Sequence, residues 1–211
     1  MASKSGRLAI LENSIIKLGL EHRQAACLTL AAAFANDPAM SWMLRDPTVR
    51  ARRLPMLMDW MFTDHLRYGM ILGTPGCEVV TLWRPPGRVH EHPALTPRAA
   101  IRFIRILGTA VLRAERLDRW IDRHLPTGER QFYLRMAGVR PDRQGQGLGG
   151  LAIRKGLEQS DAAGLPVVLE TATVGNVPLY RALGYQVISN WTMPQGGLNF
   201  WTMAREPILA L

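Results

Sequence analysis

The sequence is poor in cysteine and has no long hydrophobic run. Its two cysteines, Cys27 and Cys77, are too few for a disulfide framework or a four-ligand zinc pattern. No window approaches the ~20 consecutive apolar residues that a membrane-spanning helix needs. The apolar run Leu8–Leu11 is also shorter than the ~7–15 residues of a signal-peptide core. These absences predict a protein of the reducing cytoplasm, with residues 1–12 as a loose leader.

Lysine is nearly absent, whereas arginine is abundant. Three lysines and 23 arginines stand against 17 acidic residues, which gives a formal net charge of +9. This excess predicts a polyanionic partner, which could be nucleic acid, a membrane surface or a phosphate-rich cofactor. Charged residues make up only 20% of the 211-residue chain and hydrophobic residues 47%. That balance is typical of a globular protein with a sizeable core and excludes a mostly disordered one.

The order of expected elements indicates one α/β domain over residues 13–211. We expect strands at residues 14–19, 70–73, 78–83, 131–139, 165–170, 184–189 and 200–204, and helices at residues 21–35, 48–68, 97–124, 147–163 and 174–183. Pro55 is expected to bend or divide the second helix, and the 97–124 segment is expected to break near Gly108. An early hairpin followed by strand–helix–strand crossovers predicts a mixed sheet.

A glycine-rich loop between a strand and a helix is the most informative segment. It runs from Val139 to Gly150 and holds four glycines in the six positions that begin at Gly145. A helix N-terminus carries unpaired N–H groups and about half a positive charge. Glycines let the backbone approach an anion closely. The loop therefore predicts a phosphate-binding site rather than a plain turn.

Two phosphate-binding patterns fit this loop. Gly145, Gly147 and Gly150 match the dinucleotide pattern G-x-G-x-x-G, and Glu170 lies 20 residues beyond the last of them. Five residues, however, separate the strand from the first glycine, and too little chain remains for a doubly wound sheet. The second pattern is Q-x-x-G-x-G, from Gln144 onward, and it also accounts for the preceding Gly-Val-Arg-Pro.

Residues 131–205 resemble the GNAT acetyltransferases and, among them, the puromycin N-acetyltransferases. The resemblance rests on four ordered runs at residues 132–149, 164–171, 176–185 and 193–203, with weaker echoes at residues 31–38 and 82–86. It implies a mixed, mostly antiparallel sheet of six to seven strands with helices on both faces. Two central strands, ending near Val139 and Glu170, would splay apart to admit acetyl-CoA.

The resemblance also divides the chain into an acceptor-side half, about 13–125, and an acetyl-CoA-binding half, about 126–205. The residues expected to bind acetyl-CoA are Val139, Gln144, Gly145, Gln146, Gly147, Leu148, Gly149, Gly150 and Asn176. The methionines and tryptophans between residues 40 and 62 are expected in the core, with some of them lining the acceptor pocket.

Two residues are candidates for proton transfer during acetylation of an amine. Tyr180, within Asn-x-Pro-x-Tyr, would donate a proton to the leaving thiolate as a general acid. A core tyrosine on an amphipathic helix is the alternative. Glu170 ends an apolar strand, where burial would raise its pKa toward that of a useful base. A structural hydrogen-bonding residue is the alternative there. A backbone N–H near Val139 would polarise the carbonyl.

Other functions stay open from the sequence. A GNAT domain that binds CoA without turnover and a basic nucleic-acid-binding protein are both alternatives. The arginines of residues 97–124 fit either a solvated helix face or an anion-binding face. His90 and His92 lack further ligands at a recognisable spacing, so no metal is expected. We expect an enzyme that acetylates a small-molecule amine, such as an antibiotic or an aminoacyl compound. It would act as a monomer or homodimer, without a membrane or nucleic-acid partner.

Overall fold

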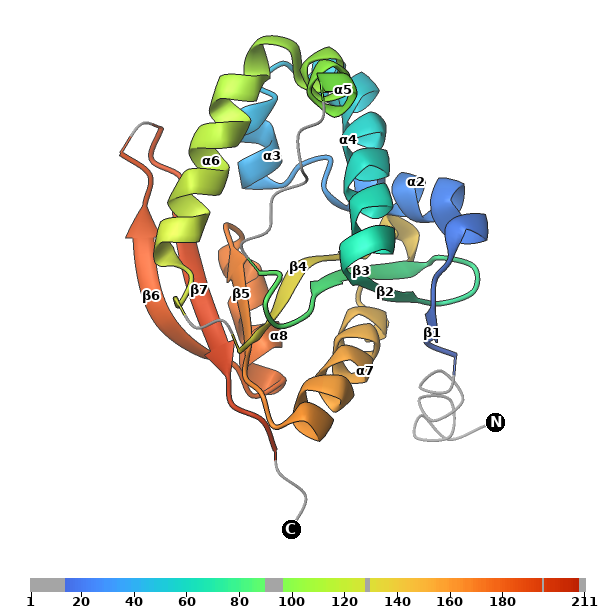
Figure 1. The fold of residues 1–211 in the computed structure, drawn as a ribbon, viewed down its shortest axis with the longest axis vertical. Coiled ribbons are helices and arrows are strands. Elements are labelled where there is room, and N and C mark those ends of the chain that lie inside the picture. Colours follow the sequence, from blue (N-terminus) through green and yellow to red (C-terminus); the bar gives the residue numbers. More distant parts are fainter. Residues whose placement is uncertain (1–13, 90–96, 128–129, 195, 209–211) are drawn as a thin grey trace.

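A seven-stranded sheet organises the computed structural model of the chain (Figure 1). The structure describes residues 14–89, 97–127, 130–194 and 196–208. The strand order is β1-β2-β3-β4-β5-β7-β6, and β4 and β5 are the parallel pair among these described strands. The strands are β1 (Ile16–Lys17), β2 (Met70–Gly73), β3 (Val79–Arg84), β4 (Phe132–Val139), β5 (Val167–Thr171), β6 (Gln186–Thr192) and β7 (Asn199–Arg205). The expected mixed, mostly antiparallel α/β fold is confirmed, and this sheet is not the parallel one of a doubly wound fold.

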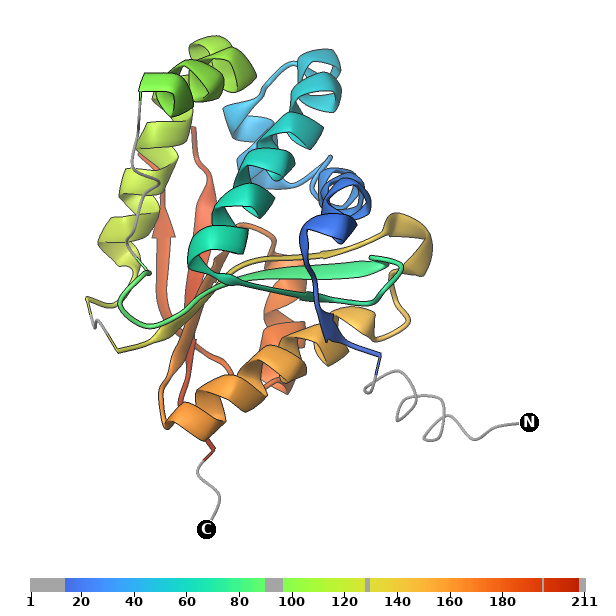
Figure 2. The ribbon, with the colours of Figure 1, turned by 45° about the vertical axis from the view of Figure 1, so that its right-hand side comes forward.

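Helices cover both faces of the sheet (Figure 2). They are α2 (Arg23–Ala33), α3 (Pro38–Met43), α4 (Pro47–Tyr68), α5 (Pro97–Leu107), α6 (Val111–His124), α7 (Leu148–Ala163) and α8 (Val177–Ala182), with short 3-10 turns at Leu20–His22, Gly108–Ala110, Pro141–Arg143 and Val174–Asn176. Figure 2 shows α2 and α4 on one side of β2–β4 and α7 on the other. Within the described ranges, no helix is long and apolar enough to cross a membrane. The expected leader at residues 1–12 lies outside the described residues.

Acidic caps set where two N-terminal helices begin. The carboxylate of Asp37 accepts a hydrogen bond from the N–H of Met40 at 3.0 Å and starts α3. The carboxylate of Asp46 accepts from the N–H groups of Thr48 and Val49 and starts α4. The sequence pattern predicts the end of a helix at Asp37, but not the short helix that begins there.

Two expected helix breaks have different outcomes. Pro55 lies inside α4 without dividing it. The buried side chains of Leu54, Leu57 and Met58 hold that part of the helix in the core, and their burial outweighs the ~3 kcal/mol that an internal proline costs. Gly108, with φ +55°, does separate α5 from α6, as expected.

Some element bounds differ from those expected. The strand expected at residues 14–19 is reduced to the two residues of β1, and the last helix is preceded by a 3-10 turn. The strand expected at residues 184–189 instead runs to Thr192, because it pairs with β7 up to Asn199.

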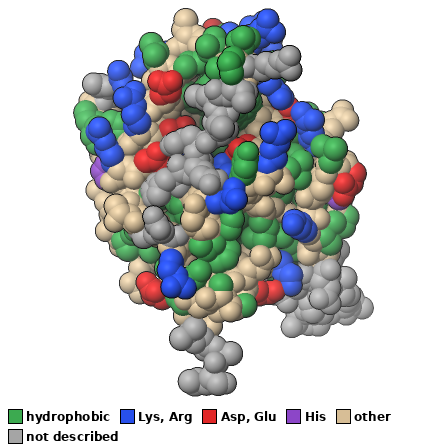
Figure 3. All heavy atoms as spheres, in the orientation of Figure 1, with side chains coloured by type: hydrophobic (Ala, Val, Ile, Leu, Met, Phe, Trp, Pro, Cys, Tyr) green, Lys and Arg blue, Asp and Glu red, His purple; other side chains and the backbone are tan. Residues whose placement is uncertain are grey.

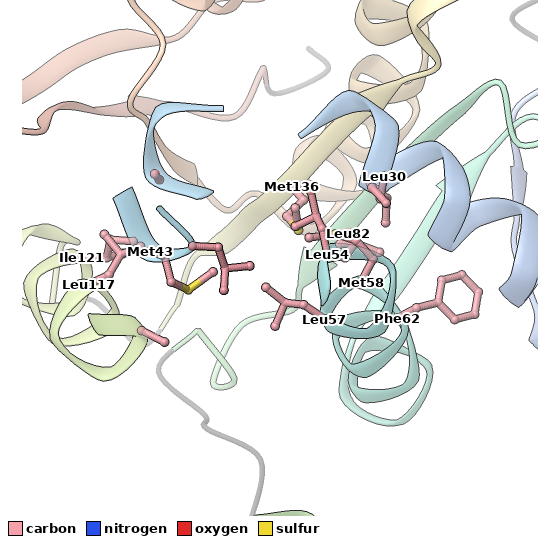
Figure 4. Close-up of a cluster of buried hydrophobic side chains, with 14 of the residues drawn as sticks. Leu30, Met43, Leu54, Leu57, Met58, Phe62, Leu82, Leu117, Ile121 and Met136 are labelled. Carbon is pink, nitrogen blue, oxygen red and sulfur yellow. The ribbon is translucent and has the colours of Figure 1, made fainter. Parts of the chain in front are cut away.

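Two hydrophobic cores lie on opposite faces of the sheet. Val80 and Leu82 of β3 point into the first core, and Val79 and Trp83 point into the second. Figure 4 shows part of the first core, built from side chains of α2, α3, α4, α6, β3 and β4. In the second core α7 packs closely on the sheet, because Gly156 leaves room for the indole ring of Trp83.

Candidate active site

The parallel strands β4 and β5 pair at one end only. Phe132 pairs with Val167 and Tyr133 with Val168, and the two strands then diverge (Figure 1). Beyond that point β4 continues along β3, and β5 continues along β7. Within the described residues, the edge of β4 that faces β5 therefore has no strand partner beyond Tyr133. Its backbone N–H and C=O groups are available to a ligand, and the expected splay is confirmed.

A cavity of about 480 Å³ opens at this splay. Its walls include residues of β4, β5 and α8 and residues of α3, α4 and α6. Glu170 lines it together with Asn176 and Tyr180, which belong to a different sequence motif from Glu170. The methionines and tryptophan of residues 40–62 that line it are Met40, Met43, Trp60 and Met61. The volume is in the range of small-molecule sites.

A β-bulge lies at Arg135, on the part of β4 that lines the cavity. Leu82 pairs with Met136 and Trp83 pairs with Leu134, so Arg135 is an extra residue on β4. Strict alternation would send neighbouring side chains to opposite faces of the sheet. Around the bulge, Tyr133 and Met136 both belong to the first core although three positions separate them, and Arg135 bonds to the Tyr133 hydroxyl on that side.

A chain of hydrogen bonds links Arg135 to Glu170. Nη2 of Arg135 donates to Oδ1 of Asp118 on α6 at 2.6 Å, and Nη1 donates to the hydroxyl of Tyr133 at 3.0 Å. The Tyr133 hydroxyl lies 2.7 Å from Oε1 of Glu170. Side chains from α6, β4 and β5 therefore meet in one network at the cavity wall.

Glu170 has one restrained oxygen and one free oxygen. Oε1 is held by Tyr133, whereas Oε2 is buried without a hydrogen-bond partner among the described residues. Burial raises the pKa of Glu170 to about 7, although the charge of Arg135 and the bond from Tyr133 oppose the rise. A carboxyl group that is partly ionised at neutral pH is suited to accept a proton there.

Tyr180 lies on α8 and is buried at the cavity wall. Burial raises the pKa of its hydroxyl above the ordinary value of 10, and the nearby carboxylates of Glu170 and Asp37 raise it further. The hydroxyl is therefore protonated at neutral pH. Glu170 and Tyr180 thus give one cavity a group that can accept a proton and a group that can donate one.

The glycine loop begins at the end of β4 that lies away from the β4–β5 pair. Gly145 and Gly147 have φ angles of +74° and +82°, and a Cβ on either would meet no atom within 4 Å. Gly147 precedes α7 directly, so the N–H groups of the first helical turn lie beside open space. The loop therefore offers an uncrowded backbone and a positive helix end to an anion.

Side chains around the loop serve mainly to brace it. The side-chain amide of Gln144 donates to the carbonyl of Val139 at 3.2 Å, and that of Gln146 reaches the carbonyl of Asp142 at 3.5 Å. Leu148 is buried in the second core. A ligand in the loop would thus meet backbone groups from Gln144 to Gly150.

Carboxylates outnumber arginines around the cavity. Among the described residues the acidic lining is Asp37, Asp64, Glu115, Asp118, Asp122 and Glu170, and the basic lining is Arg84, Arg119 and Arg135. Ion pairs to Asp64 and Asp118 already neutralise Arg84 and Arg135. His65 adds no charge, because burial lowers its pKa to about 3. Carboxyl groups thus outnumber arginines among the described lining residues, which favours a cation.

The arginines of residues 97–124 are partly used within the fold. Arg102 pairs with Asp59 of α4 at 2.5 Å, and Arg113 donates to the carbonyl of Met43 at 2.7 Å. In Figure 3 the Lys and Arg side chains are spread over the face shown, among acidic and apolar ones. That face has no continuous basic patch of the kind that follows a nucleic-acid backbone.

Sequence reasoning missed Tyr133, Arg135 and Asp118. Tyr133 and Arg135 lie two positions apart on an expected strand, so a shared face was predictable, but the bulge and its partners were not. Asp118 is one of three acids on α6, and nothing in the sequence singles it out from Glu115 and Asp122. Its role follows from α6 packing against the splay.

Of the other sequence candidates, the two cysteines do not line this cavity. The His90–His92 segment lies outside the described residues. Among the residues that are described, no group of three or more histidines, cysteines or acids could hold a metal ion. Cys27 and Cys77 are buried, and burial raises the pKa of the Cys27 thiol to about 12. Such a thiol is not a nucleophile at neutral pH.

Comparison with known proteins gives relatives along nearly the whole chain. No protein-family model matches it. An uncharacterized N-acetyltransferase of Schizosaccharomyces pombe is 25% identical over 205 residues, which cover 89% of this chain and 80% of that protein. A Corynebacterium glutamicum protein, described as histone acetyltransferase HPA2 and related acetyltransferase, has a TM-score of 0.70 at 20% identity, over 93% of this chain and 97% of its own. Arylalkylamine N-acetyltransferase 2 of Aedes aegypti has a TM-score of 0.58 at 12% identity, over 91% and 97%.

Proposed function

We propose that this chain, which has the fold of the GNAT acetyltransferases, transfers the acetyl group of acetyl-CoA to an amine of a small molecule. The observation that carries the proposal is that Glu170 and Tyr180 line one cavity at the β4–β5 splay. Glu170 has a pKa of about 7, and the hydroxyl of Tyr180 is protonated at neutral pH. The names of the similar proteins agree with this activity.

The open backbone of the glycine loop fits the pyrophosphate of acetyl-CoA. The N–H groups of residues 145–150 would bind it, and the glycines at 145 and 147, both with positive φ angles, place no side chain in its way. The free edge of β4, up to Val139, would hold the pantetheine arm by backbone hydrogen bonds. Asn176, exposed at the start of α8 and part of the cavity lining, would contact the same arm.

The two titratable residues would move the protons of the reaction. Acetyl-CoA supplies a thioester, whose carbonyl carbon forms a bond to the amine nitrogen while its bond to sulfur breaks and CoA leaves as the thiol. Oε2 of Glu170 takes the proton that the nitrogen loses, directly or through a water. The Tyr180 hydroxyl gives its proton to the sulfur. Solvent then carries the proton from Glu170 back to Tyr180, which restores both groups.

The acceptor that suits this cavity is a cationic amine with an apolar body. The excess of carboxylates would draw the ammonium form to the cavity, where it first releases one proton to solvent; Glu170 then takes the proton that the neutral amine loses on forming the amide. Apolar contacts to the rest of the molecule would come from Phe34, Trp60, Phe103 and Phe200. An antibiotic amine or an aminoacyl compound combines both features. Both are compatible with the likeness of residues 131–205 to puromycin N-acetyltransferases, whose shared motifs serve many acceptors.

Thiol release from acetyl-CoA tests the proposed function. The purified protein would be given a panel of aryl-bearing amines, puromycin included, each paired with the analogue in which a hydroxyl replaces the amine. We expect thiol release with amines only, and an equal amount of acetylated amine by mass spectrometry. A folded protein that binds acetyl-CoA and acetylates no amine of the panel would contradict the proposal and favour a CoA-binding domain without turnover.

A further inference from the structure

Hydrogen-bond chemistry fixes the proton of the Tyr133 hydroxyl. The guanidinium of Arg135 can only donate, so its bond of 3.0 Å to the Tyr133 oxygen makes that oxygen an acceptor. The hydroxyl has one proton of its own, and the remaining partner is Oε1 of Glu170 at 2.7 Å. The Tyr133 proton must therefore point at Oε1. Because Oε1 is occupied by Tyr133, Oε2 is the oxygen of Glu170 that has no hydrogen-bond partner among the described residues.

We propose that Arg135 is a positioning residue: its guanidinium directs the Tyr133 proton onto Oε1 of Glu170 and so reserves Oε2 as the oxygen that takes the proton of the acceptor amine. This inference rests on the proposed function of Glu170 as the base. It assigns no contact with substrate to Arg135, which acts through Tyr133.

The position of Arg135 is itself fixed by the fold. Arg135 lies two positions from Tyr133 on β4, beside the bulge opposite Leu82 and Trp83, and its side chain reaches the Tyr133 hydroxyl at the cavity wall. Asp118 on α6 holds the far side of the guanidinium at 2.6 Å. The guanidinium carbon also lies 5.7 Å from the centre of the Tyr133 ring, a cation–π distance. Because both ion-pair partners are partly buried, the pair is screened less than an exposed one.

The charged and titratable groups around Glu170 act on it with opposite signs. Arg135 and Tyr133, both from β4, stabilise its carboxylate, and Asp118 from α6 disfavours it. Tyr180 from α8 is neutral near pH 7 and interacts electrostatically with Glu170. Removing Arg135 and removing Asp118 should therefore move the titration of Glu170 in opposite directions. A residue that only supports the fold would not produce that pair of results.

The test is a titration of Glu170 in the full chain. The side-chain carboxyl carbon of Glu170 would be followed by 13C NMR, with Glu170→Gln for assignment, alongside the pH profile of kcat/KM. We expect Arg135→Met to raise the pKa of Glu170 by roughly one pH unit, since an opposite charge nearby lowers a carboxyl pKa by about 1–3 units. Asp118→Asn should lower it, and Arg135→Lys should bring it back toward the wild-type value. Arg116→Met removes an exposed arginine of the same helix as Asp118 and should leave it unchanged.

The NMR titration needs no turnover, so the two proposals fail separately. An active enzyme whose Glu170 titration is unmoved in Arg135→Met, or moves the same way in Arg135→Met and Asp118→Asn, overturns the inference. If Arg135→Met does not fold, Tyr133→Phe removes the central link while Asp118 and Arg135 stay paired. It should also raise the pKa of Glu170, and an unchanged pKa overturns the inference equally. A protein that shows the expected shifts but acetylates nothing contradicts the proposed function instead.

Discussion

The rings of Tyr180 and Tyr185 meet edge to face, with their centres 5.9 Å apart. Tyr180 also lines the cavity, whereas the hydroxyl of Tyr185 is buried with no hydrogen-bond partner among the described residues. The contact holds the Tyr180 ring through apolar surface rather than through its hydroxyl. The two tyrosines therefore offer a matched pair of hydroxyl deletions, one at the site and one beside it.

Tyr180→Phe should lower kcat by ~10²-fold or more, because the variant cannot protonate the leaving sulfur. Its ring still packs on Tyr185, so acetyl-CoA binding should persist. Tyr185→Phe is the control and should leave kcat unchanged, since it removes an unpartnered buried hydroxyl. Steady-state kinetics and calorimetric binding measure both effects. A Tyr180→Phe enzyme with wild-type kcat would remove Tyr180 from the role of acid.

The activity should depend on pH through Glu170. A base acts in its ionised form, and burial raises the pKa of Glu170 to about 7. We predict that kcat/KM falls tenfold for each pH unit below about 7 and levels off above it. Glu170→Gln should lose most of the activity and the acid limb with it. An acid limb that persists in Glu170→Gln would mean that another group is titrating.

Glu170 should also make the stability of the fold depend on pH. Its pKa is about 7 in the folded protein, against an ordinary value of 4.5. Between these values the folded chain binds more protons than the unfolded chain, so the free energy of unfolding decreases as pH rises through this window. The loss is on the order of 3 kcal/mol when both values are passed. The free energy of unfolding would be measured by urea at pH 5 and at pH 8. The stability of Glu170→Gln relative to the wild type should be greater at pH 8 than at pH 5. If the difference in free energy of unfolding between Glu170→Gln and the wild type is the same at both pH values, the burial of Glu170 is contradicted.

Gly147→Val should abolish acetyl-CoA binding. A valine strains a φ of +82° and places branched carbons in the open space of the loop, where the pyrophosphate would lie. Gly87→Val is the matched control, because Gly87 also has a positive φ of +78° with open space around it. It follows β3, at the end of the strand away from the loop. Both variants should lose similar stability by thermal unfolding, and Gly87→Val should still bind. Normal binding by Gly147→Val would refute the position of the pyrophosphate.

The helices, the strands and the glycine loop could be predicted, because each is indicated by residues that lie close together in the sequence. The apolar period of residues 48–68 outweighs Pro55, and Gly108 marks a break that does occur. The closely spaced glycines of the loop predict an unusual backbone from the sequence alone. The burial of Glu170 was also foreseeable, since it ends an apolar strand.

The rest depends on contacts between distant segments. The bulge at Arg135 comes from the register of β4 on β3. No residue of β4 indicates that register in the sequence. The partner of Arg135, Asp118, is 17 residues away, on a helix that carries two other acids, Glu115 and Asp122. Helix α3 forms because Asp37 caps it and its apolar side chains find the core, although six residues are too few to show a period.

Thermal unfolding with acetyl-CoA, beside NADH as a control, tests the central claim most directly. A ligand that binds only the folded chain adds about 2.7 kcal/mol at 100 times its Kd, a Tm rise of roughly 2–4 °C for a chain of this size. We predict that rise with acetyl-CoA and none with NADH. A folded protein stabilised by NADH alone, or untouched by acetyl-CoA at millimolar concentration, would contradict the account.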